Sequence, residues 1–208
     1  MRAMVTAMLL WASGSAGALA DTAAYVSQLF DHYAQSCGIA FTDPQGYVNS
    51  IPPQNAKGQA NVVLSPDGLL VKAYHADAGF AAEVTFARHT EKLLATCIVM
   101  PMPDHPEFQR SIQIMSQQDG LSAYTETLAS AVQSTIPSQK GITIIGGRTP
   151  MSNLYDYYGD QFSNELLVQS RHDFSFVLNA GDTKVPSIIA VEAGSVSIYS
   201  AHVIELGQ

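Results

Sequence analysis

Apolar side chains recur every third or fourth residue in the stretch 21–36, which predicts an amphipathic helix. Tyr25 and Leu29 lie on its apolar stripe, and the intervening polar residues fall on the opposite side. Gly38 is expected to end this helix, because glycine adopts the left-handed conformation of a helix C-terminus at little steric cost. Residues 42–60 are rich in proline, glycine and asparagine and predict a loop.

The same spacing appears in residues 121–136, which predicts a second helix that Pro137 stops. Residues 107–118 suit both a helix and a strand. We favour a helix there, because Asp104 can cap its first turn and Glu107 follows three residues later, as in a capping box.

Short apolar or alternating runs, separated by polar or glycine-containing turns, predict a series of β-strands. Residues 93–100 are apolar on both faces and indicate a doubly covered strand, whereas residues 81–88 alternate and indicate one buried face. Because the turns are short, neighbouring strands should pair as antiparallel meanders. The expected strands are residues 61–65, 69–75, 81–88, 93–100, 141–145, 166–170, 174–179, 185–191 and 196–205.

These elements predict an α+β fold in which antiparallel β-meanders pack against helices. Residues 101–106 contain three prolines and are interpreted as a joint between an N-terminal half, 21–100, and a C-terminal half, 107–208. The two halves form either separate units or one continuous domain.

A weak internal sequence repeat is compatible with duplication of an α+β unit, although chance would also produce such a repeat because alanine, leucine and valine are common. The matching residues are Ala24, Tyr25 and Leu29 with Ala123, Tyr124 and Leu128, and Leu69, Leu70, Val71 and His75 with Leu166, Leu167, Val168 and His172.

Residues 1–20 have the pattern of a secretory signal peptide that is cleaved from the mature protein. Arg2 supplies the positive start, residues 3–12 form the apolar segment, and residues 18–20 (ALA) fit the cleavage motif. An uncleaved anchor would need about 20 consecutive apolar residues, and glycine and serine interrupt this run. No cysteine follows the cleavage motif, which excludes a lipoprotein anchor. The expected location is the periplasm or the cell exterior, with no membrane span after cleavage.

Composition and charge narrow the functional classes. Hydrophobic residues make up 47% of the 208 residues, which indicates a folded domain rather than a disordered chain. The net charge of −8 and the pI near 5.0 argue against nucleic acid or an anionic membrane surface as partners. Cleavage after Ala20 removes one basic residue, Arg2, and no acidic one, which makes the charge one unit more negative.

The mature chain has two cysteines, Cys37 and Cys97, which predict one structural disulfide in an oxidising compartment. A redox-active pair is the alternative, but reactive dithiols usually stand in a C-x-x-C motif, and these two are far apart in sequence.

Motifs of catalysis are missing: the sequence has no G-x-S-x-G, H-E-x-x-H, C-x-x-C or phosphate-binding loop, so no catalytic residue is assigned. Residues 146–148 (GGR) are interpreted as a turn.

The acid pairs Asp104/Glu107 and Asp156/Asp160 are candidates for acid–base chemistry by residue type alone, and helix capping explains them more simply. The histidines lack metal-ligand spacing, so neither a metal nor a cofactor is predicted. These histidines are His32, His75, His89, His105, His172 and His202.

Residues 154–162 mix aromatic and acidic side chains and are the strongest candidate for a binding surface. Tyrosine is over-represented at recognition surfaces, and aromatic rings beside aspartate also suit sugars or cations. The alternative is that these tyrosines pack between helix and sheet with their hydroxyls in water. The candidate binding residues are Tyr155, Asp156, Tyr157, Tyr158, Asp160 and Phe162.

Three functional hypotheses follow. The favoured one is a secreted or periplasmic non-catalytic accessory protein that contacts another envelope protein, in its narrower form an inhibitor or immunity protein. The first alternative is a binder of a small molecule or glycan in the cleft between the halves. The second alternative is a hydrolase whose active site is assembled by the fold from distant residues.

Overall fold

The computed structural model describes residues 3–52, 60–65, 68–89, 91–116, 120–139, 141–148, 174–192 and 194–205. In chain order these residues form α1 (Ala3–Thr42), α2 (Pro44–Ser50), β1 (Ala60–Leu64), β2 (Leu70–Asp77), β3 (Phe80–His89), β4 (Lys92–Pro101), α3 (Pro106–Ser116), α4 (Leu121–Thr135), a 3-10 turn η1 (Ile136–Ser138), β5 (Ile142–Arg148), β6 (Phe174–Ala180), β7 (Thr183–Glu192) and β8 (Ser195–Glu205).

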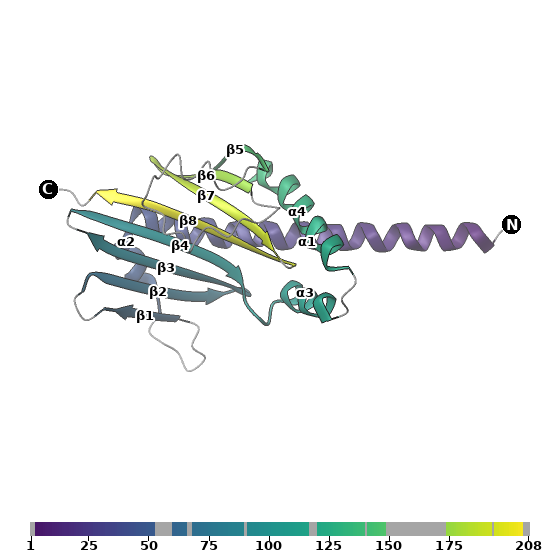
Figure 1. Cartoon of the computed structure of the whole chain (residues 1–208), viewed down its shortest axis with the longest axis horizontal. Coiled ribbons are helices and arrows are strands. Elements are labelled where there is room, and N and C mark those ends of the chain that lie inside the picture. Colours follow the sequence, from purple (N-terminus) through teal and green to yellow (C-terminus); the bar gives the residue numbers. More distant parts are fainter. Residues whose placement is uncertain are drawn as a thin grey trace.

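The strands form one eight-stranded antiparallel sheet in the order β1-β2-β3-β4-β8-β7-β6-β5, which confirms the predicted α+β class (Figure 1). The meander of each predicted half contributes four strands. The two meanders meet where β4 pairs with β8, from Lys92 opposite Glu205 to Val99 opposite Ile198. The sheet is therefore continuous across both halves.

The order of elements repeats along the chain, since helices precede four antiparallel strands twice. The hairpin turns also repeat with equal spacing. Two residues separate Asp77 from its partner Phe80, and two separate Ala180 from its partner Thr183; β3–β4 and β7–β8 also each have a two-residue turn. Such repetition is what a duplicated unit would produce, and duplication stays a prediction.

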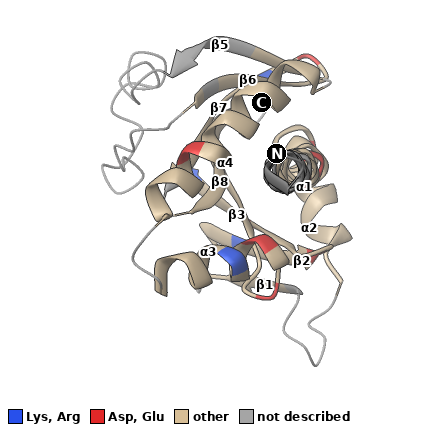
Figure 2. Ribbon diagram, turned by 90° about the vertical axis from the view of Figure 1, so that its right-hand side faces the viewer, with Lys and Arg blue, Asp and Glu red and all other residues tan. Residues whose placement is uncertain are grey.

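Helix α1 lies across one face of the sheet, against β3, β4, β6, β7 and β8, and α4 packs beside it (Figures 1 and 2). The predicted apolar stripe of α1 is buried, with Tyr25, Leu29 and Tyr33 each at most 4% exposed. Side chains from every second residue of the central strands complete the core, among them Val84, Phe176 and Ile198. None of the described helices covers the opposite face.

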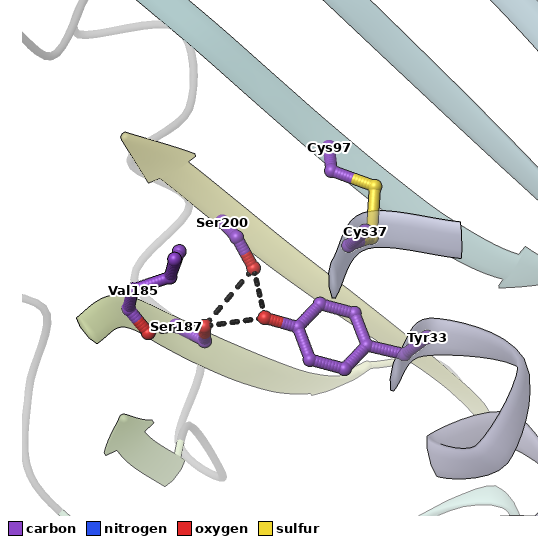
Figure 3. Close-up of a disulfide and its surroundings, with 6 residues drawn as sticks. All are labelled: Tyr33, Cys37, Cys97, Val185, Ser187 and Ser200. Carbon is purple, nitrogen blue, oxygen red and sulfur yellow. Dashed lines mark hydrogen bonds between the residues drawn. A yellow bond between two sulfur atoms is a disulfide. The ribbon is translucent and has the colours of Figure 1, made fainter. Parts of the chain in front are cut away.

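Two links fix α1 to the middle of the sheet (Figure 3). The predicted disulfide forms between Cys37 and Cys97, with both residues fully buried. One helical turn earlier, the hydroxyl of Tyr33 lies 2.6 Å from Ser187 Oγ and 2.7 Å from Ser200 Oγ. Burial raises the pKa of Tyr33 to about 12, so this hydroxyl stays protonated.

The end of the first helix was predicted wrongly. Helix α1 continues through Gly38 to Thr42, because Ala40 and Phe41 are buried and their packing outweighs the preference of glycine for a helix end. Within the expected loop, α2 begins at Pro44. The Asp43 carboxylate caps it by accepting the Gly46 N–H at 2.9 Å.

Two smaller expectations also change. The Glu107 N–H donates to His105 Nδ1 at 3.2 Å, so His105, rather than Asp104, supplies the side-chain acceptor at the start of α3. Residues 146–148 belong to β5 instead of a turn, and a register shift against β6 lies between Ile144 and Arg148. The strand expected at 166–170 lies outside the described residues. The second copy of the weak leucine-rich repeat, at residues 166–172, lies outside them too.

Candidate functional site

The tyrosine-rich segment proposed from the sequence lies outside the described residues, and its role stays a prediction. The acid pair Asp156/Asp160 and His172 fall in the same range. The other sequence candidates lie within the described structure, and Asp104, His105 and Glu107 come together there with residues of α1.

Two adjoining depressions lie where residues 21–35 of α1, the β2–β3 turn and the start of α3 meet. The larger has a volume of about 380 Å³, the smaller of about 170 Å³, and both are lined by Gln28 and Ala78. We call the pair the α1 groove. The other lining residues are Asp21, Ala24, Tyr25, Gly79, Asp104, His105, Pro106 and Glu107 in the larger depression, and Asp31, His32, Gln35, Asp77 and Phe80 in the smaller one.

Aromatic rings form the buried side of the α1 groove, with Phe80 at their centre. The Phe80 ring centroid lies 4.8 Å from His105, 5.9 Å from Tyr25 and 5.9 Å from His32. Tyr25 and His105 are also 5.0 Å apart. These spacings are those of packed aromatic rings, so the groove has a stiff apolar floor.

The β2–β3 turn is shaped to let His105 approach closely. Ala78 has φ 51° and Gly79 has φ +83°, both in the left-handed region. A Cβ atom at Gly79 would lie 2.7 Å from His105 Cδ2, so glycine is required there for space as well as for conformation. The β2–β3 turn is thus a wall of the groove.

Burial favours the neutral form of both groove histidines. Burial lowers the pKa of His32, and nearby His75 lowers it further, while Asp77 opposes the shift. Burial also lowers the pKa of His105, against the opposing effect of Glu107 and Asp104. Since His105 Nδ1 accepts the Glu107 N–H, the proton of the neutral ring is on Nε2.

His32 is nine-tenths buried, and its Nε2 atom has no hydrogen-bond partner among the described residues. A buried ring nitrogen without a partner is costly, since it has given up water without replacement. His32 therefore carries a buried polar atom beside the α1 groove whose hydrogen-bonding capacity is not met within the described part of the chain.

Acidic side chains dominate the rim, and none of the described residues that line either depression is a lysine or an arginine. Glu107 is already paired: it accepts the Tyr124 hydroxyl and lies 3.5 Å from Arg110 Nη1. The carboxylates of Asp31, Asp77 and Asp104 are exposed and form no ion pair within the described part of the chain. The groove thus offers negative charge above an aromatic floor.

The polar side chains that line the described part of the groove are carboxylates, glutamine amides, two histidines and a tyrosine. Among the described residues, no serine, threonine or cysteine lines either depression. Ser187 and Ser200 do approach Tyr33 elsewhere, but all three are buried in the core, where a substrate cannot reach them. Among the described residues, no three His, Cys, Asp or Glu side chains form a group that could hold a metal ion.

A second candidate surface is the sheet edge at β1. Val63, Leu64 and the neighbouring Leu69 have exposed fractions of 52%, 65% and 50%. The strand sequence ANVVL has no charged residue and no proline, and its register with β2 is unbroken. At the opposite edge, β5 carries the register shift before Arg148. Proteins usually blunt their sheet edges with such irregularities or charges, and β1 lacks both.

Neither the family models nor the curated proteins nor the solved structures that we compared with this chain match it. None of the described helices has the length and apolar character needed to cross a membrane.

Proposed function

We propose that the protein is an exported, non-catalytic accessory protein that binds another protein of the cell envelope by strand addition at β1. The observation that carries this proposal is the combination of exposed Val63 and Leu64 with an uncharged, regular edge strand. Within the described chain, β1 has a neighbour on one side only, so backbone groups on its other side face outward.

The chemistry of this edge specifies the kind of partner. Outward-facing backbone N–H and C=O groups bind another extended segment, as in other cases of β-strand addition. Val63 and Leu64 point to opposite faces of the strand, so the added segment needs apolar side chains near both. It should also be uncharged, because β1 offers no opposite charge.

Three features support export. The first twenty residues have the composition of a cleavable leader. The amino-terminal part of α1 extends away from the rest of the molecule (Figure 1), and Thr22, at 1% exposed, is buried immediately after the expected cleavage site. The buried Cys37–Cys97 disulfide fits an oxidising compartment.

The test begins with a photo-crosslinking amino acid at Val63 in the exported protein, and at Ile112 in α3 as the matched exposed control. We expect Val63, and not Ile112, to crosslink to one envelope protein. With that protein purified, Val63→Lys should raise the Kd about tenfold or more, because a charge would be buried at the added strand, whereas Ile112→Lys should leave it unchanged. Both variants must melt like the parent.

If Val63 crosslinks only to a second copy of this chain, β1 mediates self-association rather than binding of another protein, and the proposal is overturned. Equal weakening by Val63→Lys and Ile112→Lys would show that β1 is not the contact surface. If the captured protein is an enzyme that loses activity in the complex, the narrower inhibitor hypothesis is supported.

A further inference from the structure

We propose that the segment added at β1 is an antiparallel strand whose backbone bonds to Val62 and Leu64, and that its residues opposite these two are apolar and are not proline. This inference rests on the proposed function. It adds the direction of the partner strand, its register and the residues that its sequence can carry.

Two contacts beside β2 fix which of its backbone groups face β1. The Arg88 N–H donates to the Leu69 carbonyl at 2.7 Å, so that carbonyl faces β3. Backbone groups of successive residues in a strand point to opposite edges, so those of Leu70 face β1. The Ser65 N–H does donate to the Leu70 carbonyl at 2.9 Å, and the Leu70 N–H donates to Ser65 Oγ at 2.9 Å. The two contacts therefore agree.

The unbroken register extends this alternation along β1. Val63 lies opposite Lys72, two residues from the contact between Ser65 and Leu70, so the backbone groups of Val63 face β2. Those of Val62 and Leu64 face the other way, toward the open edge. Each of these two residues offers one N–H donor and one C=O acceptor to an added strand.

This edge fits an antiparallel strand. In an antiparallel pair, a residue that faces its partner strand exchanges both its N–H and its C=O with one opposite residue. Every strand pairing in the described sheet is antiparallel, and sheets of a single direction are over-represented. Parallel pairs are also slightly less stable per residue.

The side chains along the edge determine which residues fit. Leu64, Val71 and Phe86 lie opposite one another on three neighbouring strands, on the face of the sheet that holds the core. Leu64 is 65% exposed, so this apolar row is open at its outer end. An apolar residue opposite Leu64 would extend the row, and the residue opposite Val62 lies on the same face.

The backbone pattern also determines where the partner can carry proline. The residues opposite Val62 and Leu64 must each donate an N–H, which proline lacks. The residue between them, opposite Val63, turns its N–H away from β1, so proline is tolerated there.

The open edge is tested on the purified protein by amide hydrogen exchange, measured by NMR. We expect the amides of Val62 and Leu64 to exchange about tenfold faster or more than those of Asn61 and Val63, which donate to β2. Equal protection of all four amides would mean that the edge is not open, and would overturn the inference without any partner.

The direction is tested with the envelope protein that crosslinks to Val63. Asn61 and Val63 lie on the same face of β1, two residues apart. In an antiparallel pair, a photo-crosslinker at Asn61 reaches the partner about two residues C-terminal to the site reached from Val63. The reverse order, or a proline or charged residue on either side of the site reached from Val63, would overturn the inference.

The backbone contact is tested by comparing Leu64→Pro with Leu64→Val. Proline removes the outward N–H and leaves the bonds to β2 in place, whereas valine keeps the N–H and loses one methylene group. We expect Leu64→Val to raise the Kd no more than about fourfold, and Leu64→Pro to raise it about thirtyfold or more. Leu64→Pro should melt nearly like the parent, whereas Val63→Pro, which removes an N–H that donates to β2, should melt lower.

Equal Kd values for Leu64→Pro and Leu64→Val would overturn the inference, even if Val63 still crosslinks to the partner, because the Leu64 N–H would then be unused. If Leu64→Pro does not fold, the exchange rates and the order of the crosslinks still decide. Absence of any crosslink from Val63 to another protein would overturn the proposed function itself, and this inference with it.

Discussion

Cys97 and Ser200 lie directly opposite each other across the β4–β8 pair, and each links the sheet to the same helix. Cys97 is bonded to Cys37, and Ser200 contacts the hydroxyl of Tyr33, one turn earlier on α1. At the join between the two meanders, a disulfide therefore ties β4 to α1, and a network of hydroxyl hydrogen bonds ties β8 to the same helix.

Removing the disulfide should destabilise the fold substantially. It closes a loop with a sequence separation of 60, and the chain-entropy model gives about 4 kcal/mol for a loop of that size. Urea unfolding of a Cys37→Ala/Cys97→Ala variant should show this loss. The parent protein with reductant should approach the variant, and the variant should not respond to reductant. A variant as stable as the parent would contradict this account.

Tyr33→Phe should cost about 1–2 kcal/mol, because it removes two hydrogen bonds in a fully buried place. The remaining hydroxyls stay satisfied in part, since Ser200 and Ser187 are 3.0 Å apart and Ser187 contacts the Val185 carbonyl. Denaturant unfolding measures the change. Tyr74→Phe is the control, because the Tyr74 hydroxyl donates only to the Met102 sulfur, a weak acceptor, and its loss should be nearly neutral.

Stability should fall as the solution is acidified through the range of histidine titration. Burial lowers the pKa of His32, His105 and His202 below the ordinary value of 6.5 in the folded protein. The unfolded chain then binds protons at a higher pH than the folded chain. Each contribution is thus complete above about pH 6.5 and is lost as the pH falls toward the folded pKa.

The measurement is the free energy of unfolding between pH 7.5 and 5. His32→Gln should reduce the slope in this interval, because one of the titrating groups is gone, even if the variant is less stable overall. Parallel curves for the parent and His32→Gln would rule out a contribution from His32.

Local signals in the sequence predicted most of the elements. The apolar spacing of Tyr25, Leu29 and Tyr33 predicted the part of α1 at residues 21–36, whereas the helix itself runs from Ala3 to Thr42, and the glycine-containing turn before residue 81 indicated the β2–β3 hairpin. Where local preference competed with packing, packing determined the outcome, as at Gly38. The pairing of β4 with β8 could not be predicted, because nothing local to either strand specifies its partner on the side without a hairpin.

The α1 groove was beyond the reach of sequence patterns for a related reason. His32, Asp77 and His105 come from three segments with no fixed spacing between them, and only the fold brings them to one place. Each looks like an ordinary surface residue in sequence. Asp104 and Glu107 were candidates by type, but their role at the rim depends on the approach of His105 to Gly79.

The position of β8 in the sheet determines when during folding the sheet can become continuous. Among the described strands β8 comes last in sequence, yet it lies between β4 and β7, and its Ser200 is one of two partners of the Tyr33 hydroxyl, which lies 167 residues earlier. Such contacts between residues far apart in sequence slow folding, because the long intervening segment must be brought together first. Removing this strand would not simply narrow the sheet. It would divide the sheet into two parts, β1–β4 and β5–β7, with no strand pairing between them.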